Sequence, residues 1–567
     1  MICLIDKQCT FGSPVKLLMN DKNKPIYLLL FILALVVNFA GINVKFFTDD
    51  PGLYASISKN LIYRKEFFEL FTYNQDWLDK PHFPFWMVMF SFKLFGINVW
   101  AYRLPALLFF LLSLLYTWLF TKKHYGQEIA CIAVLILATS QHLIMSNTDV
   151  RAEPYLMALV IGSIYYISRL EERFTFRDLL LAALLAACAI MTKGIFVIVA
   201  IYGALLGQLI FQNKFRQLFQ LKWIALFLLT LIFTFPELYA LYIQFDLHPE
   251  KLVFHRHNVS GIKWFLWDSQ FGRFVNNGPI TRQSGSIFFY MHTLLWAFAP
   301  WCLLFYYAIY KNIREIISKR KLAEYYTISG GLLLLLLFSL SRFQLPFYTN
   351  TIFPLFAIIT ASFCYKQLSH AGAIYRQASL WLYIAAFPIA ILVMHYLLKP
   401  ADITFFVIDC LLFGATAIII FTKIKTPYLK AFCLTCTAAL FANFYLNTVF
   451  YKEWGDYKGQ IKAADYINQP AFNNYHIYTV RQENNIFQFY SKKQIDFIPI
   501  HSFKDFKPTG PSAFYVNRLS LDSIILDHAD FKLIKAFQNY PQEIILPAFI
   551  NKNTRNKVLD SIYLITK

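Results

Sequence analysis

Long apolar segments, separated by short charged ones, run along most of the chain. A helix needs about 20 mostly apolar residues to cross a bilayer, and thirteen segments of this character occur before residue 451. They lie at 26–45, 101–120, 128–146, 151–168, 178–191, 194–211, 223–243, 288–309, 325–341, 346–364, 379–398, 403–421 and 431–450. The pattern therefore predicts a mostly α-helical, polytopic membrane domain over residues 1–451, with about thirteen spans.

The pattern changes after Tyr451. Short runs rich in β-branched and aromatic residues are typical of strands, and they occur at 476–480, 494–500, 512–517 and 561–567. Stretches with helical periodicity, at 458–468 and 519–527, lie between them. We expect residues 452–567 to form a small extracytoplasmic α/β domain. It carries no phosphate-binding loop and no catalytic triad, so we interpret it as an accessory module.

The distribution of charge predicts the orientation. The 567 residues include 53 Lys and Arg against 33 Asp and Glu, a net charge of +20. Alternate loops counted from the N-terminal segment 1–25 hold 22 basic residues against 6 acidic ones. Because basic residues in short loops stay on the cytoplasmic side, we expect the N-terminus inside and the tail outside. The excess of basic residues then reflects the membrane topology, and we expect no nucleic-acid partner.

Two long non-spanning stretches, 46–100 and 244–287, fall on the outer face, where sites are usually built. The first contains Asp49, Asp50 and Pro51, a typical helix start with Asp as N-cap and Pro at the first helical position. Apolar residues at a spacing of four then predict a short amphipathic helix in the membrane interface. The two carboxylates are either purely structural, or one caps the helix while the other faces a reaction site.

Further charged residues occupy the outer loops. Lys80, next to Asp79, is interpreted either as a phosphate ligand or as an interfacial lysine that reaches lipid headgroups. Asp149, Arg151 and Glu153 lie within five residues and form either a local ion pair or part of a site.

Single basic residues mark three other outer loops: Lys193, Arg342 and Lys399. Carboxylates and isolated cations therefore converge on one membrane face. A phosphate-bearing lipid substrate and a reacting hydroxyl require this combination.

Metal chemistry has weak support. His248, His255 and His257 are close in sequence and are candidate ligands, although a solvated loop explains them better. Cys433 and Cys436 form a C-x-x-C pair inside an apolar segment and are interpreted as buried small residues. We expect no required cofactor and leave a divalent metal open.

The order of these features along residues 26–365 resembles that found in the C-type superfamily of membrane glycosyltransferases, which use polyprenyl-phosphate sugars. The similarity is to the protein O-mannosyltransferases of family 39 and to the lipid A aminoarabinose transferases. The matching features are Asp49-Asp50 with Tyr54-Ala55, Asp79-Lys80-Pro81, Leu94-Phe95-Gly96, Tyr102-Arg103-Leu104-Pro105, Asp149, Thr192-Lys193-Gly194, Pro300-Trp301 and Leu345-Pro346-Phe347-Tyr348.

The resemblance implies an inverting transferase of the bacterial cytoplasmic membrane, with its active site on the periplasmic side. Asp50, or alternatively Asp49, would activate the acceptor, and Asp149 would support the site. Lys80 and Tyr348 would hold the donor phosphate. The acceptor would be a lipid or a protein.

One position departs from the aminoarabinose transferases, which carry Arg just before the Tyr-Ala pair, where this chain has Leu53. Neutralisation of the phosphate then depends on Lys80, Lys193, Arg151 or Arg342, and aminoarabinose becomes a doubtful sugar. A flippase for lipid-linked sugars and a ligase for lipid-linked glycans are the alternatives.

Overall fold

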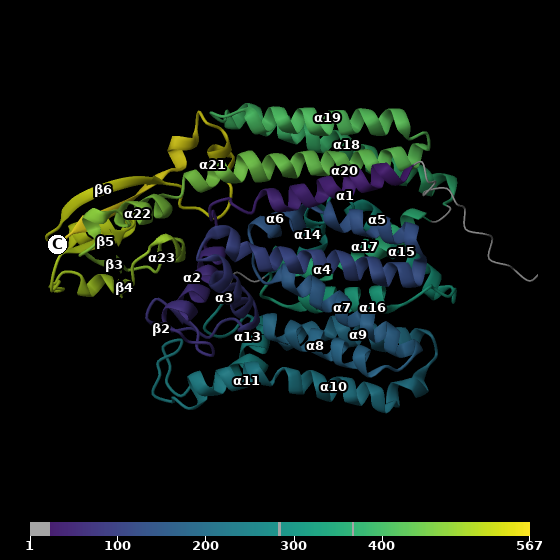
Figure 1. The fold of residues 1–567 in the computed structure, drawn as a ribbon, viewed down its shortest axis with the longest axis horizontal. Coiled ribbons are helices and arrows are strands. Elements are labelled where there is room, and N and C mark those ends of the chain that lie inside the picture. The colour runs from purple at the N-terminus through teal and green to yellow at the C-terminus, as the bar shows by residue number, and fades with distance from the viewer. Residues whose placement is uncertain (1–22, 282–284, 366–367) are drawn as a thin grey trace, which may run out of the picture.

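The structure is a computed structural model that describes residues 23–281, 285–365 and 368–567. Most of the predicted inner segment 1–25 lies outside these residues. The long helices run side by side, and the small sheet lies beyond one end of them (Figure 1). The structure thus confirms a mostly α-helical chain with a small C-terminal sheet.

Each predicted apolar segment coincides with one helix or with a broken helical stretch. The main helices are α1 (Lys24–Ala40), α4 (Val99–Tyr125), α5 (Gln127–Ala138), α6 (Gln141–Thr148), α7 (Glu153–Glu172), α8 (Phe176–Lys193), α9 (Ile198–Phe211), α10 (Leu221–Phe233), α11 (Phe235–Leu241), α14 (Phe289–Ala297), α15 (Cys302–Ile317), α16 (Tyr326–Leu340), α17 (Phe353–Tyr365), α18 (His370–Leu398), α19 (Thr404–Lys423) and α20 (Pro427–Tyr445).

Among the described residues, six helical stretches are long and apolar enough to cross a membrane. They become seven if α5 and α6, which meet at an angle of 57°, count as one span. Shorter helices such as α1 and α16 fall below that length. The predicted total of about thirteen spans therefore stays a prediction.

The predicted inner loops meet at one end of the bundle. Glu171, in the last turn of α7, accepts hydrogen bonds from Lys214 at 2.6 Å and from the Tyr326 hydroxyl at 2.5 Å. Tyr125 at the end of α4 donates to Glu324 at 2.7 Å. The predicted outer loops meet at the opposite end, beside the sheet (Figure 1).

Short elements fill the outer loops. The first loop contains α2 (Asp49–Tyr63), β1 (Phe71–Thr72), β2 (Gln75–Asp76) and α3 (Phe83–Phe95), and the second contains α12 (Gly261–Lys263) and α13 (Ser269–Val275). The helix expected after Asp50 is present as α2, but it begins at Asp49, with Thr48 as N-cap. The expected Asp N-cap is therefore wrong, because Thr48 takes the extended N-cap conformation and both aspartates lie in the first turn.

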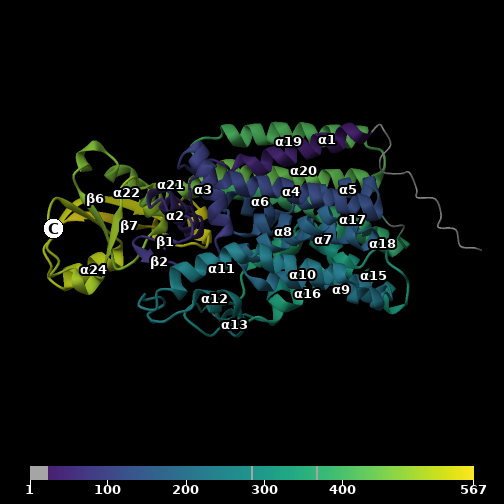
Figure 2. The same ribbon diagram turned by 60° about the horizontal axis from the view of Figure 1, so that its bottom comes forward.

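The tail forms a mixed sheet in the order β4–β3–β5–β7–β6. Its strands are β3 (His476–Val480), β4 (Ile495–Ile498), β5 (Ser512–Val516), β6 (Lys532–Asn539) and β7 (Asp560–Thr566), and its helices are α21 (Tyr451–Asp456), α22 (Gly459–Ile467), α23 (Asn485–Tyr490), α24 (Arg518–Leu526) and α25 (Pro547–Ile550). β3 pairs in parallel with β4 and β5, and β7 is antiparallel to β5 and β6. Figure 2 shows α22 and α24 on different sides of the sheet.

The tail packs directly on the first outer loop. Lys59 of α2, only 3% exposed, donates to the carbonyls of Gln488 and Ser491, at 2.7 and 2.6 Å, where α23 ends. Gly52 of α2 lies so close to α23 that a Cβ there would come within 2.9 Å of the Ile486 nitrogen. Helix α2 is thus enclosed between the bundle and the tail.

Candidate functional site

Arg151 joins two of the predicted acidic residues. Its guanidinium forms an ion pair with Asp50, in the first turn of α2, and a second with Asp149 at 3.1 Å. The Asp149 side chain is 1% exposed and also accepts a hydrogen bond from Thr48, whereas the Asp50 side chain is 43% exposed. Asp50 is therefore the accessible carboxylate of this group, and Asp149 is a buried anchor for Arg151.

The short segment between α6 and α7 brings these charges together. Arg151 precedes α7, and its guanidinium lies 3.9 Å from the ring centroid of Phe347. Arg103 is fully buried and donates to the carbonyls of Val44 at 2.5 Å and Thr148 at 2.6 Å. The loops that carry Asp50 and Asp149 are thus tied to α4 by one side chain.

Asp49 faces the tail. Its carboxylate accepts a hydrogen bond from the Asn485 amide at 2.6 Å, and its backbone N–H donates to Glu543 at 3.1 Å. Burial raises the pKa of Asp49 to about 6, and the negative charges of Glu543 and Asp50 act in the same direction. The two adjacent aspartates therefore have different surroundings, one at Arg151 and the other at the tail.

Glu153 and Lys193 form a buried ion pair between the start of α7 and the end of α8. The Lys193 ammonium lies 4.0 Å from the ring centroid of Tyr348. Three predicted residues from distant parts of the sequence therefore meet here.

Lys80 pairs with Asp79 at 2.6 Å, and Arg273 of α13 pairs with the other oxygen of the same carboxylate. Burial lowers the pKa of Lys80 to about 8, and the positive charge of Arg273 adds to the effect. Arg273 was not predicted from the sequence. Its place in the second long outer loop is the only sequence signal that could have identified it.

Among the described residues, no hydrogen bond or ion pair links the Arg342 side chain to these clusters. Its side chain is exposed, and its backbone is hydrogen-bonded to Phe274 at 2.9 Å and to Gly285 at 3.0 Å. The backbone of Arg342 therefore lies beside α13, and the guanidinium that pairs with Asp79 belongs to Arg273.

The histidine loop does not assemble a metal site in the part of the chain that the structure describes. His248 hydrogen-bonds the carboxylate of Glu250 at 2.9 Å, and His257 hydrogen-bonds the carbonyl of the same residue at 2.9 Å. His255 has a left-handed backbone conformation, with φ of 60°. These contacts are those of a loop held by its own side chains.

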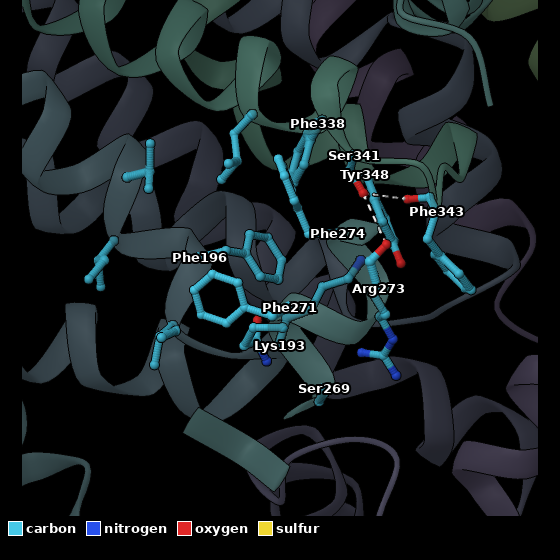
Figure 3. A pocket seen from close by; sticks show the side chains of 15 residues that line it. Lys193, Phe196, Ser269, Phe271, Arg273, Phe274, Phe338, Ser341, Phe343 and Tyr348 are labelled. Atoms are coloured by element: carbon cyan, nitrogen blue, oxygen red, sulfur yellow. Dashed lines mark hydrogen bonds between the residues drawn. The ribbon is translucent and has the colours of Figure 1, made fainter. Parts of the chain in front are cut away.

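A small cavity joins the cations of two clusters. Lys80, Lys193 and Arg273 all line it. Lys193 and Arg273 also line a neighbouring cavity of about 310 Å³, whose other walls are mostly apolar. Figure 3 shows Lys193 and Arg273 among the aromatic side chains that line this cavity. The charged cavity has a volume of only about 10 Å³, and it shares Lys193 and Arg273 with the apolar cavity, so the two are adjacent.

A family model, Dolichyl-phosphate-mannose-protein mannosyltransferase, matches residues 79–239. An Aquifex aeolicus protein of uncharacterised function is 25% identical over 350 residues, which is 60% of this chain and 64% of that protein. An undecaprenyl phosphate-alpha-4-amino-4-deoxy-L-arabinose arabinosyl transferase of Edwardsiella ictaluri is 24% identical over 352 residues, which is 61% of this chain and 60% of the transferase. The match thus spans less than two thirds of each relative.

The fold is similar to that of ArnT from Cupriavidus metallidurans, whose crystal structure was determined bound to undecaprenyl phosphate. The TM-score is 0.73 at 16% identity, over 95% of this chain and 98% of the other. The same protein in the apo state gives a TM-score of 0.71. Together with the relatives, this likeness confirms the resemblance of the chain to the C-type membrane glycosyltransferases.

Proposed function

We propose that the protein is an inverting glycosyltransferase that moves a sugar from a polyprenyl-phosphate donor to an acceptor hydroxyl or phosphate. The main support for this proposal is that Lys80, Lys193 and Arg273 line one cavity. This cavity adjoins the apolar cavity of about 310 Å³. A lipid phosphate has these two parts, an anionic headgroup and a long apolar chain. The ArnT structure with undecaprenyl phosphate supports the assignment through its similar fold.

The donor phosphate would lie among these three cations. In the described structure each of them pairs with a carboxylate, Asp79 or Glu153. The phosphate would share the cations with those carboxylates. As the bond between the anomeric carbon and the phosphate oxygen breaks, negative charge grows on the leaving phosphate, and fixed cations stabilise it.

The acceptor would be activated at Asp50. Its carboxylate is the accessible one, and Arg151 fixes its position. The acceptor hydroxyl attacks the anomeric carbon from the side opposite the phosphate and gives its proton to the carboxylate, so the configuration inverts. Asp149 orients Arg151, and Asp49 is the alternative base. A lipid or a protein supplies the acceptor, and the reaction written in this way requires no cofactor.

The proposed setting is the bacterial inner membrane, with the site and the residue 452–567 domain on the periplasmic face. The meeting of the basic inner loops at the far end of the bundle supports it.

The test uses the purified protein in proteoliposomes with a radiolabelled polyprenyl-phosphate sugar. We expect free polyprenyl phosphate to form and the label to move to an acceptor fraction prepared from bacterial envelopes. Movement of intact donor across the bilayer, with no release of polyprenyl phosphate, would contradict the proposal and identify a flippase.

A further inference from the structure

A second polar cavity, of about 270 Å³, lies in the tail, outside the groups described above. Its walls come from the segments that follow β3 and β5, the two neighbouring parallel strands. Helix α23 follows β3 and packs on one face of the sheet, where Phe487 stacks on Tyr515. Helix α24 follows β5 and packs on the other face, where Leu521 joins the cluster of Phe514.

The connections therefore leave β3 and β5 in opposite directions. In sheets of this kind, ligands bind in the crevice at the carboxyl ends of the strands where the connections diverge. The cavity occupies this position, and its volume is near the lower end of the roughly 300–1,000 Å³ typical of small-molecule sites.

One buried side chain of the wall lacks a partner. Gln460 of α22 is 8% exposed and lines the cavity, and its Oε1 has no hydrogen-bond partner within the described residues. A buried polar atom without a partner costs stability. This oxygen is shielded from water, and a ligand in the cavity that reaches it and donates a hydrogen bond would remove this cost.

The rest of the wall is polar and nearly balanced in charge. Glu483 and Asp560 are acidic and Arg518 is basic, and side-chain amides lie between them. Asn517 donates to Gln482 at 2.9 Å across the two loops, and Asn539 donates to Asp560 at 2.9 Å. Planar amides and carboxylates of this kind form paired hydrogen bonds with adjacent hydroxyl groups.

The cavity adjoins the acceptor side of the proposed site. Asn484 lines the cavity, and the next residue, Asn485, donates to Asp49 at 2.6 Å. The lipid-phosphate cations lie in other elements, the β2–α3 loop, α8 and α13.

We propose that this cavity is a subsite for a neutral, hydroxyl-rich carbohydrate portion of the acceptor. The identification as an acceptor subsite depends on the proposed transferase function. With two carboxylates and one guanidinium in its wall, the cavity disfavours anionic sugars.

The experiment uses the full-length protein in nanodiscs and saturation-transfer NMR with N,N′-diacetylchitobiose and lactose as neutral probes and galacturonate as an anionic one. We expect the neutral probes to bind and galacturonate not to bind. Gln460→Met and Glu483→Gln should each weaken neutral-probe binding about tenfold or more. Gln542→Met, a change at an exposed residue nearby, should leave it unchanged.

Two further measurements separate this role from a structural one. The melting temperature of ligand-free Gln460→Met should be equal to or higher than that of the wild type, because the substitution removes an unpaired buried oxygen. A melting temperature lowered together with binding would assign Gln460 a structural role and overturn the proposal. Binding of undecaprenyl phosphate, followed by native mass spectrometry, should be the same in all variants.

The two proposals fail differently. Absence of neutral-probe binding, or binding that both variants leave unchanged, refutes the subsite while donor turnover stands. A wild-type protein that binds the neutral probes but neither binds nor turns over the donor refutes the transferase, and with it the assignment of the cavity to an acceptor.

Discussion

Each cation of the proposed site forms an ion pair with at least one carboxylate. Arg151 holds Asp50 and Asp149, Lys193 holds Glu153, and Lys80 holds Asp79. Buried charges without a partner are costly, which explains why the cations that we propose as phosphate ligands occur in ion pairs. An incoming phosphate then meets cations whose positions are already fixed.

Removal of one such cation should weaken donor binding. We expect Lys80→Met to lower the affinity for undecaprenyl phosphate roughly tenfold or more, because a positive charge is lost and Asp79 loses a partner. Lys93→Met, at an exposed residue at the end of α3, is the matched control and should bind normally. Native mass spectrometry with graded lipid measures both, and equal affinities would remove Lys80 from the phosphate site.

The pKa of Asp49 leads to a prediction about stability. Because its pKa rises from 3.8 to about 6 on folding, the folded state binds the proton more tightly. The stabilising contribution of this proton is present below pH 3.8 and is lost as pH rises through 6. Asp49→Asn, which still accepts a hydrogen bond from Asn485, should therefore raise the melting temperature at pH 8 and have little effect at pH 4. A difference in melting temperature between Asp49→Asn and the wild type that is the same at pH 4 and pH 8 would contradict the raised pKa of Asp49.

The sequence predicts which charged residues lie at the same end of the bundle better than it predicts how they pair. Asp50, Asp149 and Arg151 were assigned to one membrane face from loop topology and charge, and they are in contact. Arg273 could not be predicted as the partner of Asp79, because α13 and the first outer loop meet only through tertiary packing. Arg342 was a candidate on charge alone, and the same packing leaves its side chain exposed.

Among the elements, α2 links the predicted site to the tail. Its first turn carries Asp49 and Asp50, and its later residues Ser56 and Lys59 bind the backbone of α23. The position of the tail on the bundle therefore fixes the surroundings of Asp49.

Lys59 is the residue through which this contact can be tested. Lys59→Met keeps the apolar stem but leaves the last carbonyls of α23 without their donor, which should lower stability by about 1–3 kcal/mol. Limited proteolysis should then cut the tail faster than in the wild type. Lys93→Met should behave like the wild type, and an unchanged cleavage rate in Lys59→Met would argue against a stabilising role for this contact.

Local pattern identified most tail elements. Four strands were predicted from alternating β-branched and aromatic residues, and β3 matches its predicted limits, 476–480. β6 was missed because it is an edge strand whose Lys532 and Lys535 are exposed. Helix α23 was missed because six residues are too few for a periodicity.

For the whole molecule, the arrangement of charge predicts a fixed orientation. Cysteines introduced by Asp527→Cys in the tail and Lys319→Cys in a predicted inner loop should react differently with a membrane-impermeant maleimide in spheroplasts. We expect labelling at 527 only, and at both positions after lysis. Labelling at 319 in intact spheroplasts would reverse the proposed topology.

Sugar transfer in proteoliposomes by matched aspartate variants measures whether Asp50 takes part in catalysis. With a radiolabelled polyprenyl-phosphate sugar and an envelope acceptor fraction, Asp50→Asn should reduce the rate of transfer about 100-fold or more. Asp527→Asn, an exposed change in the tail, should retain the wild-type rate. Donor binding should persist in both variants. Full transfer by Asp50→Asn and by Asp49→Asn alike would contradict the assignment of the first-loop carboxylates to catalysis.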